Sequence, residues 1–158
     1  MAFDKETNPD LTFQVIGGAI EVHRRLGPGL LEHTYRSCLA HELGLLGLRV
    51  AAEVPIPIVY KGIELGTTYR ADLVVEDLLL VELKAVDQIL PVHCMQTVTY
   101  LKLSAFKTAL LINFNIPCLK DGVRRFANSH LSADRPAVDR PRPLASVGPE
   151  DGAFPAPP

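Results

Sequence analysis

The sequence predicts an α/β sandwich, a mixed β-sheet flanked by helices, with elements in the approximate order ααββββαββ. Residues 8–46 carry apolar side chains at helical spacing, whereas residues 49–84 consist of short β-rich runs. Beyond residue 84, one predicted helix separates two further β-rich runs. A strand–helix–strand unit of this kind places its two strands parallel in one sheet.

The first predicted helix begins with Asn8 as N-cap and Pro9 at the first helical position, and it runs to Leu26. Gly27 follows as a stop. Two glycines inside this helix, at positions 17 and 18, either permit a close contact or weaken the helix.

A second helix is predicted from about Leu30 to Leu46, because apolar side chains recur there at helical spacing. Its buried side is expected to carry Leu31, Tyr35, Cys38 and Leu39.

Four β-rich runs follow, with the sequences VAAEVPIPIVY, GIELGTTY, RADLVV and LLLVELK. Pro55 and Pro57 remove backbone donors on one side of the first run, which places it at a sheet edge. Pro91 then begins a helix over VHCMQTVTYLKL, and the strands KTALLINF and GVRRFA complete the sheet.

Length and composition are those of one soluble globular domain. The chain has 158 residues, of which 47% are hydrophobic and 22% charged. A formal net charge of −2 provides no overall basic field, so a nucleic-acid partner would need a local patch. The three cysteines are far apart and include no C-x-x-C, which argues against a disulfide framework or zinc knuckle and predicts that all three (Cys38, Cys94 and Cys118) are buried.

The two ends of the chain differ from its centre. The first ten residues lack the basic and apolar regions of an export signal, and no apolar run is long enough to span a membrane, so we expect a cytoplasmic protein. Residues 133–158 contain 7 of the 13 prolines and few large apolar side chains, too few to offset the entropy of ordering. We therefore expect a folded domain over residues 1–129 and a disordered Pro-rich tail over residues 130–158.

Acidic and basic side chains converge on the last two of the four β-rich runs. Glu82 and Lys84 lie two apart on a strand and so project from one face. A three-residue turn over Glu76–Leu78 would also place Asp72 opposite Glu82, whereas a two-residue turn would break this pairing. Adjacent carboxylates isolated from water demand a proton or a cation, and Mg²⁺ is bound through one or two carboxylates plus waters. The pattern predicts a metal-dependent hydrolytic site, with Lys84 to neutralise charge, orient a phosphate or hold a water.

These residues match the motifs of a known group. Asp72 followed after nine residues by Glu82-Leu83-Lys84 resembles the PD-(D/E)XK nuclease superfamily, and GLLEHTY at 29–35 resembles the signature of its GxxExxY proteins. The strings YRADLVVED, VELKAV, QTVTYLK and LLINF are also similar to that group, so the resemblance covers roughly residues 11–127. Ala71 stands where the superfamily name has proline, at a position that carries no ligand.

The resemblance implies a restriction-endonuclease-like sandwich and a Mg²⁺- or Mn²⁺-dependent nuclease that acts on nucleic acid, DNA rather than RNA. By position, Asp72 and Glu82 would be metal ligands, with the Leu83 carbonyl as a further ligand. Lys84 would activate a water or bind phosphate. An oligomer of this chain is left open.

Three helix residues also correspond to site positions. By resemblance, Glu32 is the helix acid that completes such sites through a direct or water-mediated contact to the metal, although an N3 glutamate supporting the helix start is the alternative. Gln96 and Tyr100 match a Q-x-x-x-Y pattern and share a helix face, which is equally typical of an ordinary amphipathic helix.

Other interpretations weigh against or beside this one. Asp72 and Glu82 on an open face would be solvated charges, but Val74 and Leu80 share that face and indicate that it is covered. A thiol–imidazole pair at His93-Cys94 is disfavoured because adjacent helix residues do not face each other. The remaining basic groups are solvated charges or phosphate contacts (Arg24, Arg25, Lys120, Arg124 and Arg125).

The function itself has alternatives. Because fold does not guarantee chemistry, the domain is alternatively a non-catalytic nucleic-acid-binding or protein-binding module that retains the nuclease fold. Hydrolysis of a small phosphodiester is a third possibility.

Overall fold

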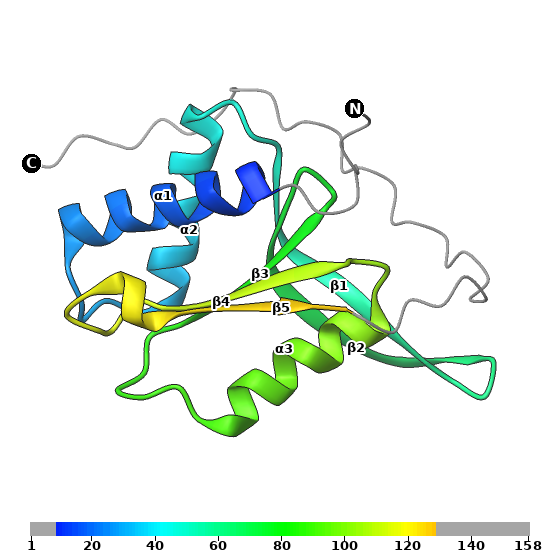
Figure 1. The fold of residues 1–158 in the computed structure, drawn as a ribbon. Coiled ribbons are helices and arrows are strands. Elements are labelled where there is room, and N and C mark those ends of the chain that lie inside the picture. The colour runs from blue at the N-terminus through cyan, green and yellow to red at the C-terminus, as the bar shows by residue number, and fades with distance from the viewer. Residues whose placement is uncertain (1–8, 129–158) are drawn as a thin grey trace, which may run out of the picture.

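The computed structural model describes residues 9–128, without the side chains of residues 9, 10, 67 and 68 (Figure 1). The predicted N-cap Asn8 and the predicted tail over 130–158 lie outside this range. The elements are α1 (Pro9–Leu26), α2 (Glu32–Leu45), β1 (Val50–Tyr60), β2 (Ile63–Val75), β3 (Leu79–Lys84), α3 (Pro91–Leu103), β4 (Thr108–Asn113), the 3₁₀ helix η1 (Leu119–Gly122) and β5 (Val123–Ala127).

The elements form three layers, with one sheet between two layers of helices. Its five strands follow the order β1-β2-β3-β4-β5, and β3 and β4 are parallel while the other neighbours are antiparallel. Helices α1 and α2 lie over one face, and α3 lies over the other (Figure 1). The predicted α/β sandwich, the parallel β3–β4 pair and the edge position of the strand with Pro55 and Pro57 are confirmed.

The predicted number of strands before α3 is wrong. Three strands precede α3 instead of four, because GIELGTTY and RADLVV form the single strand β2. Both halves of β2 pair with β1, and the change of register between them is absorbed by an irregularity at Pro57/Ile58 rather than by a turn. The β1–β2 hairpin therefore reaches well beyond the rest of the sheet (Figure 1).

Each face of the sheet has its own core. The α1–α2 side packs Val15, Tyr35 and Leu39 against odd-numbered residues of β3, including Val81 and Leu83. The α3 side is smaller, with its buried apolar side chains drawn from β1 to β4 and α3 (Val54, Ile56, Ala71, Val74, Leu80, Tyr100, Leu101 and Ala109). Both faces next to the predicted acidic residues are thus covered by helices.

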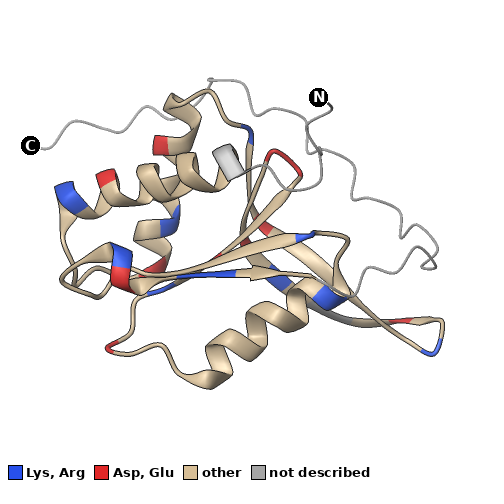
Figure 2. Ribbon diagram, in the orientation of Figure 1, with Lys and Arg blue, Asp and Glu red and all other residues tan. Residues whose placement is uncertain are grey.

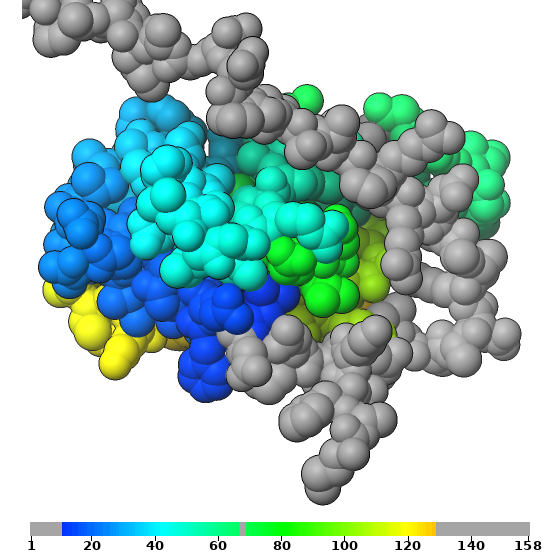
Figure 3. Space-filling model, turned by 90° about the horizontal axis from the view of Figure 1, so that it is seen from above, coloured from blue at the N-terminus to red at the C-terminus, as the bar shows by residue number. Residues whose placement is uncertain are grey.

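The two N-terminal helices pack closely where α1 has a glycine. A Cβ at Gly18 would lie 2.9 Å from Leu43 Cδ2, while a Cβ at Gly17 would meet nothing within 4 Å. Gly18 therefore permits the close contact, and α1 and α2 lie side by side above the sheet (Figure 3). Gly27 ends α1 with a φ of 69°, as predicted.

Two burial predictions are wrong. Leu31 is 67% exposed because α2 begins at Glu32, two residues later than predicted, which leaves Leu31 at the N-cap rather than on the buried side. Cys118 is exposed just before η1, whereas Cys38 and Cys94 are half-buried. None of the helices within residues 9–128 is long and apolar enough to cross a membrane.

Candidate nuclease site

The candidate site lies where β2 and β3 stop pairing. Backbone pairs join Leu73 with Val81 and Val75 with Leu79, which is the register that the three-residue turn predicted. One step further, carboxylates replace the backbone partners. Leu83 N–H donates to Asp72 Oδ2 at 2.8 Å, and Asp72 N–H donates to Glu82 Oε1 at 3.2 Å. Each carboxylate therefore accepts a backbone N–H of the opposite strand, which holds the predicted neighbours Asp72 and Glu82 next to each other.

Asp72 also lacks a ladder pair on the side of β1. The β1–β2 ladder pairs Ala52 with Leu73 and Val54 with Ala71, passing over Glu53 and Asp72. Glu53 has a φ of 51°, a conformation that costs a non-glycine residue on the order of 1–3 kcal/mol and persists only where surrounding structure enforces it. Strain of this kind is concentrated at functional sites.

This irregularity breaks the strand's alternation. In a regular strand Ala71 and Val74, three residues apart, would point to opposite faces, yet both belong to the core on the α3 side. Before Asp72 the odd-numbered side chain of Ala71 faces α3, whereas after it the even-numbered side chain of Val74 does. The orientation of the strand therefore changes at Asp72.

Arg36 binds both members of the skipped pair. Its guanidinium lies 3.1 Å from Asp72 Oδ1 and 3.4 Å from Glu53 Oε1. Neither Arg36 nor Glu53 was predicted from the sequence as a site residue. The available signal was weak, since Arg36 lies one helical turn after Glu32 and so shares its side of α2.

Glu82 is the most perturbed acid of the site. It is only 3% exposed, and burial raises its pKa to about 8, with the negative charge of Asp72 as the second cause. The backbone hydrogen bond from Asp72 and the positive charge of Lys84 act in the opposite direction on this pKa. An acid in such an environment is a candidate functional group.

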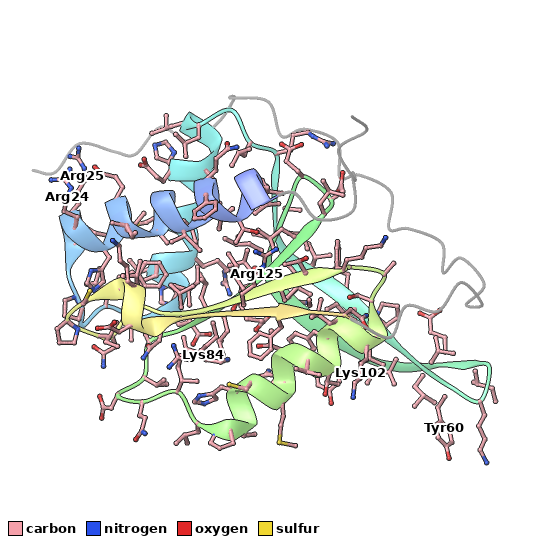
Figure 4. All side chains as sticks on the ribbon, viewed as in Figure 1. Arg24, Arg25, Tyr60, Lys84, Lys102 and Arg125 are labelled. Carbon is pink, nitrogen blue, oxygen red and sulfur yellow. The ribbon has the colours of Figure 1, made fainter. Side chains whose placement is uncertain are left out.

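Lys84 and Glu32 complete the charged cluster from β3 and α2. Lys84 is the last residue of β3, and Figure 4 shows it between the sheet and α3. Burial raises the pKa of Glu32, with Lys84 opposing this effect and Asp72 adding to it. The predicted N3 position of Glu32 is wrong, because Glu32 is the first residue of α2 and the N-cap is Leu31, which forms no side-chain cap. A carboxylate in this first turn still suits the helix dipole, so that part of the alternative stays open.

Helix α3 supplies a hydrogen-bonded pair next to the acids. Gln96 Nε2 donates to Tyr100 Oη at 2.8 Å, so the two residues share a face as predicted. Tyr100 is 4% exposed, and its pKa is raised first by burial and then, among smaller causes, by the charges of Glu82 and Asp72. The ring of Tyr69 from β2 lies against that of Tyr100, with centroids 5.3 Å apart.

His93 serves the start of α3. Its Nδ1 accepts a hydrogen bond from Leu90 N–H at 3.0 Å, which satisfies one of the free donors at the helix N-terminus. A thiol–imidazole nucleophile with Cys94 is thereby disfavoured, as the sequence indicated.

The chain leaving Lys84 is held by a buried asparagine. Asn113 at the end of β4 is 1% exposed, its Oδ1 accepts from Val86 N–H at 3.1 Å, and its Nδ2 donates to Val86 C=O at 2.8 Å. A cavity of about 180 Å³ beside Asn113 includes none of the predicted site residues. Asn113 thus positions the connection between Lys84 and α3, a role without a sequence signal.

Three of the other predicted basic residues in the described range have partners away from the acids. Arg24 and Arg25 pair with Glu21, and Arg124 donates to the Asp121 and Val123 carbonyls. Figure 2 shows lysine and arginine positions spread over helices, strands and the hairpin. Their interpretation as solvated charge is favoured over that of a single phosphate-binding patch.

The donors suit a hard divalent cation. Within residues 9–128 no three His, Cys, Asp or Glu side chains are arranged to hold a metal, and no buried side-chain nitrogen or oxygen lacks a hydrogen-bond partner. Mg²⁺, however, is commonly bound through only one or two carboxylates with waters completing its shell, and Asp72 and Glu82 are such a pair. Since N–H and C=O of one strand residue point to the same neighbour, the Leu83 carbonyl faces the same opening as its N–H.

A mixed sheet between helices, with its acidic pair at a point of strand divergence, defines the class of restriction-endonuclease-like domains. Comparison with protein families matches residues 9–126 to the PD-(D/E)XK nuclease superfamily. The chain belongs to this superfamily, as the resemblance of its motifs implied. No curated protein and no solved structure gives a significant match.

Proposed function

We propose that this protein is a divalent-metal-dependent nuclease that hydrolyses phosphodiester bonds of nucleic acid, with DNA favoured over RNA by resemblance. The observation that carries the proposal is the divergence of β2 and β3 at Asp72 and Glu82, with Lys84 on the same strand as Glu82. Superfamily membership supports the same class of chemistry.

The residues of the cluster have distinct roles in this proposal. Asp72 and Glu82 would hold Mg²⁺ or Mn²⁺, with the Leu83 carbonyl and Glu32 completing the shell directly or through water. Such an ion, when bound, would lower the pKa of a water bound to it and would neutralise phosphate charge. Lys84 holds the attacking water or a phosphate oxygen with its ammonium group, close enough to act on the pKa values of both Glu32 and Glu82.

Gln96 and Tyr100 act from the opposite side of the cluster. The Gln96 amide fixes the Tyr100 hydroxyl through their 2.8 Å hydrogen bond. The hydroxyl is then oriented toward substrate or water without the entropy cost of ordering it during the reaction.

The GxxExxY assignment belongs to the same proposal, and each named position of GLLEHTY has a local reason. Gly29 has a φ of 105°, which favours glycine. Glu32 approaches the acids from the first turn of α2. Tyr35 is fully buried, stacks on Phe114 and donates to the Gly27 carbonyl at 2.5 Å, so it anchors the turn that places Glu32.

A non-catalytic binding module is the second candidate. The ion pair between Arg36 and Asp72 favours it, because this contact partly satisfies the acid without a metal. Detectable metal or nucleic-acid binding without cleavage would support this alternative.

Cleavage of plasmid, single-stranded DNA and RNA with Mg²⁺, Mn²⁺ or chelator tests the proposal. We expect metal-dependent cleavage that Lys84→Ala lowers by about 100-fold or more. Lys102→Ala, at the other end of α3 (Figure 4), removes an equal charge and should retain activity. Cleavage that survives Lys84→Ala unchanged would point to contamination or another site and contradict the proposal.

A further inference from the structure

Tyr69 presents an exposed aromatic ring beside the candidate site. The residue is 42% exposed although its ring lies against the ring of the buried Tyr100, with 5.3 Å between centroids and 44° between planes. One part of the ring is therefore packed on protein while another part is open to water. Such a ring offers a flat face on which a planar ligand can stack.

One contact packs the ring. The backbone of Tyr69 pairs with Ile56 in the β1–β2 ladder, which fixes the strand that carries the ring. The ring itself lies against that of Tyr100, whose hydroxyl accepts a hydrogen bond from Gln96. A ring packed on one side loses less entropy on binding a ligand than a free side chain does.

The ring also lies at a suitable distance from the acids. Tyr69 precedes Asp72 by three residues on β2, which corresponds to about 10 Å along a strand. The turn of the chain at Asp72 carries Tyr69 to the α3 side, where Tyr100 meets it. A nucleotide next to a phosphate at Asp72 and Glu82 could therefore place its base on this ring.

The neighbouring charge lies on the other face of β2. Arg70 follows Tyr69 and its side chain is 68% exposed, with Nη1 3.9 Å from Glu53 Oε1. Because successive strand residues point to opposite faces, this guanidinium does not share the face of the Tyr69 ring. A nucleotide is therefore favoured by the exposed ring and by its place next to the acids.

We propose that Tyr69 is a stacking platform for an unpaired nucleobase adjacent to the phosphate bound at Asp72 and Glu82. This inference rests on the proposed nuclease function. Because the faces of a paired base inside a duplex are covered by its neighbours, a base on Tyr69 away from a duplex end must be unpaired. The substrate is then single-stranded nucleic acid, or an unpaired segment of a duplex, and little sequence preference is expected from stacking.

The absence of tryptophan from the chain offers a direct test. Tyr69→Trp in the full chain provides a single indole, whose fluorescence a stacked base quenches. With Mg²⁺ in the Lys84→Ala background, which lowers cleavage but leaves Asp72 and Glu82 to hold the ion, we expect saturable quenching by a single-stranded oligonucleotide and little quenching by an abasic strand of equal length. The control Tyr60→Trp places the indole at the hairpin tip, 62% exposed and far from Lys84 (Figure 4), and should respond weakly.

Affinity measurements separate stacking from packing. Tyr69→Phe keeps the ring and should bind the oligonucleotide as the parent does, whereas Tyr69→Leu keeps apolar bulk and should bind about 5- to 150-fold more weakly. Binding of the abasic strand should be equal in all three proteins. Thermal melts of both variants verify that they are folded.

Two results would overturn the inference. One is equal quenching by the intact and abasic strands, or no quenching of Tyr69→Trp at all. The other is equal weakening by Tyr69→Phe and Tyr69→Leu. Either result leaves the metal-dependent cleavage assay unaffected, so a failure of Tyr69 as a platform is distinct from a failure of the nuclease proposal.

Discussion

The two ends of the β2–β3 pair are built in opposite ways. At the closed end, residues 73–75 and 79–81 are apolar, buried and joined by backbone pairs. At the open end, Asp72 and Glu82–Lys84 lose that pairing, and carboxylates accept the backbone N–H groups instead. An unpaired buried N–H is costly, so the two acids stabilise the open end by accepting these N–H groups. Their carboxylates still lie next to each other. One pair of strands thus provides stability at one end and chemically reactive groups at the other.

The largest effect should come from the closed end. Leu80→Ala empties a fully buried position in the core on the α3 side, which costs about 2–5 kcal/mol of unfolding free energy and lowers the Tm by roughly 5–15 °C. Leu78→Ala, in the turn and 48% exposed, is the matched control and should change the Tm little. Equal Tm values for both variants would show that the closed end does not carry the stability assigned to it.

The open end should instead determine how the stability of the protein depends on pH. The pKa of Glu82 is raised from 4.5 to about 8, so the folded state binds a proton that the unfolded state releases between these values. Stability from this proton is complete below pH 4.5 and is lost as the pH rises through 8.

Glu82→Gln removes this titration, so the stability difference between variant and parent should shift in favour of the variant by roughly 4 kcal/mol between pH 5 and pH 9. Chemical denaturation in chelator measures it. Glu76→Gln, at the exposed turn where Arg49 lowers the pKa of the acid, should show no such gain at high pH. A pH-independent difference for Glu82→Gln would mean that Glu82 is not buried as a proton-binding acid.

The closed end could be predicted from sequence because its causes are local. The turn at 76–78 sets the register, and the apolar alternation of β3 indicates the face. The opposition of Asp72 and Glu82 follows from that register. The same local reasoning located Gln96 and Tyr100 on one helix face.

The open end was predicted only in part because its remaining causes are distant in sequence. Arg36 reaches Asp72 across 36 positions, and nothing in α2 indicates this partner. Glu53 adopts a positive φ without glycine or asparagine to suggest it. The turn of β2 at Asp72 therefore had no signal, and neither had the approach of Tyr69 to Tyr100.

A divalent ion should distinguish the open end from an ordinary buried ion pair. Binding only to the folded state stabilises it by about 2.7 kcal/mol at a hundred times Kd, so the parent Tm should rise with Mn²⁺ or Mg²⁺. At pH 9, where Glu82 is charged, Asp72→Asn should be about as stable as the parent without metal, because relief of repulsion with Glu82 offsets the lost ion pair with Arg36. It should gain much less from metal, and equal metal shifts in the two proteins would contradict the site.

Substitution of Arg36 should change stability the least. Its effect on the metal-induced rise in Tm should be opposite to that of Asp72→Asn. Arg36→Gln removes a partly buried partner of Asp72, which should lower metal-free stability by about 1 kcal/mol, since such pairs contribute little when partly solvated. Because the guanidinium competes with a cation for the same carboxylate, the variant should show a larger metal-induced rise in Tm than the parent. Arg24→Gln, whose partner Glu21 lies on α1 away from the acids, controls for the loss of charge and should leave the metal response unchanged. If Arg36→Gln instead reduces the metal-induced rise, Arg36 supports the ion by orienting Asp72, and the competition between guanidinium and cation is wrong.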